Sequence, residues 1–134
     1  MKIRFPLFVF LLALSCYFSG SALAQTGDVL ESSKIAIKTA NSKELSRYFN
    51  DIIELGFKGE EKASYSKTQA EFVLKDFFKK YSPVDFQFVH QGTSNHGMKY
   101  AIGKYNYSGG SFRVIVVVKQ FKGSDMIDSI VFEE

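Results

Sequence analysis

The chain contains no tryptophan and only two prolines and one cysteine among its 134 residues. The cysteine, Cys16, lies near the start, so residues 25–134 hold none, which excludes a disulfide, a thiolate nucleophile and a cysteine metal site there. The net charge is also small. The chain has 17 basic and 14 acidic residues, and 15 basic residues remain once Lys2 and Arg4 are set aside. A chain this close to neutral predicts neither nucleic acid nor an anionic membrane as a partner.

Residues 1–24 have the organisation of a cleavable secretory signal peptide. Lys2 and Arg4 give a positive start, residues 5–14 form an apolar run, and Ala22-Leu23-Ala24 places small residues at the positions that a signal peptidase recognises. The apolar run is far shorter than the roughly 20 residues that span a bilayer. We therefore expect no membrane span, and export to the periplasm or the extracellular space after cleavage following Ala24.

An alternative for the same segment is lipoprotein processing at Cys16. The run Ala13-Leu14-Ser15-Cys16 is similar to a lipobox, although alanine stands where leucine is usual. Residues 22–24 form the better cleavage site, so we favour the signal peptide.

Residues 25–134 are expected to form one α+β domain. A capping box, Ser66 with Gln69, opens the clearest helix, which runs to Lys80 with Val73, Leu74, Phe77 and Phe78 in its apolar stripe. Two shorter helices are expected over residues 28–40 and around Leu45. Strands are expected at 52–57, 62–65, 84–91, 98–107, 112–121 and 125–133. Helices that are segregated from antiparallel strands indicate an α+β fold rather than α/β.

This order of elements resembles the nuclear-transport-factor-2-like, or cystatin-like, cone, in which helices pack on a curved antiparallel meander sheet. More narrowly, residues 27–134 resemble a family of exported proteins from Gram-negative bacteria catalogued as domain of unknown function 4783. The resemblance includes residues 101–103 with Tyr105, and Ile127, Ile130 and Phe132 in the last strand. The cone hosts isomerases, dehydratases, ligand carriers and interaction modules, so the resemblance implies a fold and leaves the function open.

Residues that could carry chemistry are few. Cone enzymes place a carboxylate or a histidine in the pocket, and Asp51 and His90 are the weak candidates here, with Asp85 and Asp128 behind them. No spacing brings any two of them together. His90 and His96 have too few neighbouring donors for a metal site. We therefore expect no metal and no cofactor, and we favour a non-enzymatic protein over a cone-type isomerase or dehydratase with a buried acid or base.

A small apolar ligand is one possible partner of such a module. Phe86, Phe88 and Tyr105 are the candidates for the lining of its pocket. The small residues Ala101 and Gly103 leave room inside the sheet for curvature or a cavity.

A protein partner on the sheet is the other possibility, as a homodimer or in a dimeric structural subunit. If Gly109-Gly110 and Gly123-Ser124 are two-residue turns, both registers agree, and Lys119 meets Asp128. One face then carries six apolar residues that the helices do not cover: Tyr100, Ile102, Ile115, Val117, Ile130 and Phe132. An apolar face of that size predicts a homodimer, or another protein partner, on the outer face of the sheet.

Overall fold

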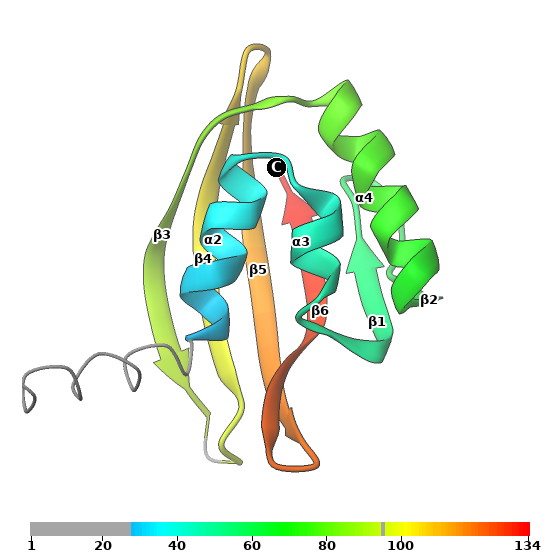
Figure 1. Ribbon diagram of the computed structural model, residues 1–134. Helices are drawn as coiled ribbons and strands as arrows, with labels where there is room; N and C mark the ends of the chain where they lie inside the picture. Colours follow the sequence, from blue (N-terminus) through cyan, green and yellow to red (C-terminus); the bar gives the residue numbers. More distant parts are fainter. Residues whose placement is uncertain (1–27, 95) are drawn as a thin grey trace, which may run out of the picture.

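The computed structural model describes residues 28–94 and 96–134 (Figure 1). The predicted signal peptide, its cleavage site and Cys16 lie outside these residues. Within the described part of the chain, no helix is long and apolar enough to cross a membrane.

A single six-stranded sheet forms one layer of the molecule, with the strand order β2-β1-β6-β5-β4-β3. Its strands are β1 (Phe49–Gly56), β2 (Ala63–Ser66), β3 (Pro83–Thr93), β4 (Lys99–Tyr107), β5 (Gly110–Phe121) and β6 (Ser124–Glu133). Every neighbouring pair is antiparallel except β1 with β6, which is parallel. The expected α+β class is confirmed, whereas the parallel pairing of β1 with the last strand was not expected.

Three helices form the second layer: α2 (Val29–Lys38), α3 (Ser42–Ser46) and α4 (Lys67–Lys80). All three lie on one face of the sheet (Figure 1), which we call the inner face. Asp28 caps α2 by accepting a hydrogen bond from the Leu30 amide. The predicted capping box of α4 is confirmed, because Ser66 accepts from the Gln69 amide and the Gln69 side chain accepts from the Ser66 amide.

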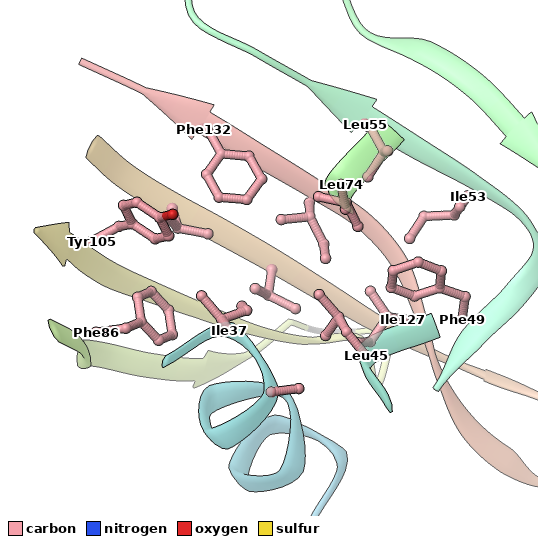
Figure 2. Packing of buried hydrophobic residues seen from close by; sticks show 14 of the residues in the cluster. Ile37, Leu45, Phe49, Ile53, Leu55, Leu74, Phe86, Tyr105, Ile127 and Phe132 are labelled. Atoms are coloured by element: carbon pink, nitrogen blue, oxygen red, sulfur yellow. The ribbon is translucent and has the colours of Figure 1, made fainter. Parts of the chain in front are cut away.

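The hydrophobic core lies between the helices and the inner face (Figure 2). The predicted stripe of α4 faces this core. Leu74 and Phe78 are buried, while Val73 and Phe77 are half-buried and pack against the core. Phe49, at the start of β1, and Leu45 of α3 close the opposite end of the core.

The β4–β5 hairpin differs from the expected register by two residues. Tyr107 pairs with Gly110 across a turn at Ser108-Gly109, and Ala101 pairs with Val116. Because side chains alternate with a period of two along a strand, an even shift leaves every residue on its expected face. Ala101, Gly103, Tyr105, Val114, Val116 and Val118 are accordingly buried on the inner face.

The β5–β6 hairpin corrects the predicted outer face. Lys122 and Gly123 have φ of 53° and 82°, so they form the turn in place of Gly123-Ser124. The register then shifts by one residue between Val117 and Val118, which is a β-bulge. The displaced turn moves the register by two residues and the bulge moves it back by one, so the net difference from the expected register is one residue. Because side chains alternate along a strand, this places Ile130 and Phe132 on the inner face, where both are fully buried opposite Val116 and Val114. Val131 takes their place on the outer face.

Candidate functional site

Aromatic rings fill the space between α4 and the inner face. Phe77 is their centre, with ring centroids 4.3 Å from Phe132, 5.1 Å from Phe57 and 5.6 Å from Phe112. Tyr105 lies on the other side, 5.9 Å from both Phe77 and Phe132. The interior of the cone is therefore filled by these aromatic side chains, which we call the aromatic cluster.

The three residues expected to line a ligand pocket lie in this interior. Phe86 and Tyr105 are fully buried, and Phe88 is half-buried. The rings of Phe86 and Phe88 pack edge to face at 5.1 Å. Phe86 also covers Gly103, so the room that the small residue leaves is taken by a ring. Contrary to expectation, Phe86 and Tyr105 belong to the packed core rather than to the wall of an open cavity (Figure 2).

Tyr105 is the buried titratable residue of this region. Its hydroxyl donates a hydrogen bond to the main-chain carbonyl of Tyr81, the residue after α4. Burial raises the pKa of the phenol above its ordinary value of 10.0. Tyr105 therefore stays protonated near neutral pH and anchors the end of α4 to β4.

The two weak catalytic candidates are exposed and far apart in the sheet. Asp51 lies on β1 and His90 on β3, with β6, β5 and β4 between them. The His90 ring nitrogen Nε2 lies 3.3 Å from the Tyr100 hydroxyl. Asp85 forms an ion pair with Lys38 at 3.5 Å. The sheet does not bring Asp51 and His90 into one site.

Buried polar groups in the described residues offer no acid or base. The buried polar side chains there are the hydroxyls of Ser33, Ser42, Ser46 and Ser129, with no carboxylate or histidine among them. No group of three His, Cys, Asp or Glu side chains placed to hold a metal occurs in residues 28–94 and 96–134.

The opposite face of the sheet, which we call the outer face, carries two cross-strand rows of apolar side chains. One row joins Ile102, Ile115 and Val131, and the other joins Tyr100 to Val117. These five side chains are half-buried, because each is covered only by its neighbours. None of the described helices lies over them (Figure 1). Four of the six predicted outer-face residues, Tyr100, Ile102, Ile115 and Val117, are thus on the outer face.

A shallow depression of about 460 Å³ hollows the outer face beside these rows. Val89, His90 and Ile102 line it together with Lys104 and Arg113. Val89 is 68% exposed, which is unusual for a valine on a strand. The sequence signal for Val89 was weak, because a β-bulge between Phe88 and His90 interrupts the alternation of β3.

A second depression, the mouth cleft, opens at the end of the aromatic cluster. It measures about 310 Å³, and Phe57, Val73, Phe77, Tyr81 and Phe112 line it. The amino group of Lys80 lies 5.3 Å from the centroid of the Tyr81 ring at its rim. Sequence reasoning did not find this cleft, because its rings come from three separate segments.

Comparison with known proteins places the chain by family and by fold. Residues 30–133 match the family model described as "Domain of unknown function (DUF4783)". A crystal structure of a protein of that family from Bacteroides uniformis is 26% identical, with a TM-score of 0.73, and the match covers 80% of this chain and 97% of that one. A comparison with curated proteins gives no match.

Two more distant structures share the fold alone. A domain of unknown function with a cystatin-like fold from Nostoc punctiforme is 7% identical, with a TM-score of 0.60, over 78% of this chain and 72% of that one. An NTF-2 like protein of unknown function from Silicibacter pomeroyi is 13% identical, with a TM-score of 0.55, over 97% and 98%. The expected cone fold is confirmed by both.

Proposed function

The chain belongs to the family of the domain of unknown function DUF4783, and from this premise we propose that it is an exported, non-enzymatic binding module that works through the outer face of its sheet. Export rests on the predicted signal peptide and cleavage after Ala24. The binding role rests on the outer face, which the fold leaves open to a protein partner.

The half-buried apolar rows of the outer face, which no described helix covers, are the observation that carries this proposal. A soluble domain covers one face of its sheet with helices and makes the other face polar when that face meets only water. Here the centre of the outer face is built from Ile102, Ile115, Val117 and Val131. A contiguous apolar patch with charged residues at its rim is typical of a protein interface.

The alternative of a cone-type isomerase or dehydratase has less support. Such an enzyme needs an acid or base inside the cone, with its pKa shifted by burial or by a partner. In the described residues the cone is filled by the aromatic cluster, and the one buried titratable side chain, Tyr105, donates its hydroxyl to a main-chain carbonyl. A binding role needs no such group.

Site-specific photo-crosslinking in cells tests the proposed surface. A photoreactive amino acid in place of Val117 is expected to form a covalent adduct with a protein. The same amino acid in place of Lys75, which is exposed on α4, is the matched control and is expected to form none. Adducts at both positions, or at neither, would contradict a binding role for the outer face.

A small apolar ligand in the mouth cleft is a second candidate function. Its support is the aromatic lining, since pockets for small molecules are concave and mostly apolar, with volumes from about 300 Å³ upward. Titration with the dye ANS, an aromatic anion, followed by amide chemical shifts tests it. Shifts that cluster at Phe57, Phe77 and Tyr81 would support the cleft. Shifts confined to the outer face would contradict it.

A further inference from the structure

Two cations lie directly opposite each other on the outer face of the sheet. Lys104 of β4 pairs with Arg113 of β5 in the register, and both side chains are exposed. Like charges that face each other across a strand pair destabilise a sheet. Glu133 lies opposite Arg113 on β6, yet within residues 28–94 and 96–134 no ion pair joins either cation to a carboxylate. An anion bound from solution would relieve this repulsion.

Both cations line the depression of about 460 Å³ on the outer face. Among the described residues of this lining, only Glu134 carries a carboxylate, and Lys58 forms an ion pair with it. Lys58 itself is not part of the lining, so the charge of Glu134 is balanced from outside the depression. The charges of Lys104 and Arg113 therefore make the depression positive.

Apolar side chains form another part of the same lining. Val89 is the extra residue of the β-bulge between Phe88 and His90. A bulge turns a side chain out of the regular alternation of a strand and is common beside functional sites. Val89 is exposed there, and it lines the depression together with the half-buried Ile102. Apolar surface and two cations thus border one hollow.

This combination of groups selects the chemistry of a ligand. A guanidinium presents N–H groups that match the two oxygens of a carboxylate, and a neighbouring ammonium adds a further donor. A small inorganic anion would leave Val89 and Ile102 in water, and a neutral hydrocarbon would leave both cations unpaired. An anionic group attached to an apolar body satisfies both parts. The volume of the depression also lies in the range of about 300–1,000 Å³ that small-molecule sites occupy.

We propose that this depression binds a small amphipathic carboxylate, an organic acid with a hydrocarbon chain. The carboxylate lies between Lys104 and Arg113, and the chain covers Val89 and Ile102. This inference goes beyond the proposed function of the outer face, which concerns a protein partner. The site is also separate from the mouth cleft, because that cleft lies on the inner side of the sheet, between α4 and the core.

Octanoate is the probe for this site, with acetate and octan-1-ol as matched controls. Acetate supplies the carboxylate without the chain, and octan-1-ol supplies the chain without the carboxylate. Titration of the purified protein, followed by amide chemical shifts, measures each affinity and locates each compound. Octanoate is expected to bind at least about tenfold more tightly than either control, because it uses both parts of the site. Its shifts are expected to cluster at Val89, Ile102 and Arg113.

Charge-removing variants distinguish a specific site from general surface charge. Arg113→Gln and Lys104→Gln are each expected to weaken octanoate about fivefold or more and to leave octan-1-ol within about twofold. Lys119→Gln is the matched control, because Lys119 lies on the same face of β5 but outside the lining. Lys119 forms an ion pair with Asp128 at 3.2 Å, as the sequence predicted. Its loss is expected to change octanoate affinity by less than about twofold.

Val89→Ser tests the apolar part of the site. This variant is expected to weaken both octanoate and octan-1-ol and to leave acetate unchanged, since only the hydrocarbon chain contacts Val89. Circular dichroism melts check that the variants fold. Removal of Lys104 or Arg113 takes away a like-charge contact, so the melting temperature is expected to equal or exceed that of the wild type. If one of these two variants does not fold, the other tests the same pair.

Three results would overturn this site. Octanoate that binds no more tightly than acetate or octan-1-ol would show that the two parts do not act together. Equal losses in Lys119→Gln and Arg113→Gln would reduce the effect to surface charge. Shifts confined to Phe57 and Phe77 would place octanoate in the mouth cleft instead. None of these results bears on the photoreactive group at position 117, which tests the protein partner of the proposed function separately.

Discussion

The ring of Phe86 covers the main chain of Gly103, and a Cβ atom at Gly103 would come within 2.6 Å of that ring. The two residues belong to neighbouring strands, β3 and β4, on the inner face. Because position 103 has no side chain, the tip of the ring can lie directly against the main chain of β4. The same ring occupies space that a ligand would need inside the cone.

Gly103→Ala is therefore expected to lower the free energy of unfolding by about 1–3 kcal/mol, since the Phe86 ring must move to admit the methyl group. Urea unfolding followed by circular dichroism measures this. The same substitution in a Phe86→Leu background is the control, because the smaller side chain leaves room and the added cost should fall. Equal costs in the two backgrounds would show that the ring is not the obstacle.

Two phenylalanines of α4 allow a matched test of the core. Phe77 packs in the aromatic cluster, whereas Phe72 is 56% exposed. Phe77→Ala is expected to cost about 3 kcal/mol, and Phe72→Ala less than about 0.5 kcal/mol. Thermal and urea unfolding of the two variants give the difference. Similar losses in both variants would mean that α4 presents a different face to the sheet.

The stability of the protein is expected to fall in alkaline solution because of Tyr105. In the unfolded chain its phenol has a pKa of about 10, whereas burial raises the pKa in the folded state. Above about pH 10 the unfolded chain releases this proton and the folded chain keeps it, so the free energy of unfolding decreases as the pH rises. Below that pH both states are protonated and the contribution is constant.

Tyr105→Phe isolates this effect. The variant loses the hydroxyl that donates to the Tyr81 carbonyl, at a cost of about 1–2 kcal/mol near neutral pH. It also loses the titrating group, so urea unfolding between about pH 9 and pH 11 should show a shallower decline than in the wild type. Parallel curves would exclude Tyr105 as the source of the decline.

If the protein is exported as proposed, its mature N-terminus is determined by signal-peptide cleavage. The protein recovered from the periplasm is expected to begin at Gln25, because Ala22-Leu23-Ala24 ends the predicted signal peptide. N-terminal sequencing and intact mass give the answer, and Ala24→Lys is expected to block cleavage. A lipid-modified start at Cys16 would instead establish the lipoprotein alternative.

The elements of the fold and the inner faces of β4 and β5 could be predicted from the sequence. Alternation along β4 and β5 is strong enough that a turn displaced by two residues did not disturb the faces. The last strand is different, because Ile127, Ile130 and Phe132 suit either face and a bulge between Val117 and Val118 decides among them. No residue type marks a bulge reliably, so Ile130 and Phe132 were assigned to the wrong face.

Long-range pairing set the other limit of prediction. The turn residues predict hairpins between strands that follow each other in the sequence. No residue near β1 indicates that this strand pairs in parallel with β6. The mouth cleft depends on the same pairing, because Phe57, the residue after β1, lines it together with Phe77 of α4 and Phe112 of β5 only when the sheet is complete.

The position of β6 has a consequence for the order in which the protein forms. β6 is made last, yet it lies between β1 and β5, with β2 outside β1 on one side and β4 and β3 outside β5 on the other. Before its 10 residues are available, the pair of β1 and β2 has no strand to join it to the rest, and a two-stranded pair is marginally stable in water. The pairing of β1 with β6 joins residues that are far apart in the sequence, and such contacts form slowly. The complete sheet can therefore form only after β6 has left the ribosome, and until then β1 and β2 cannot join the other strands.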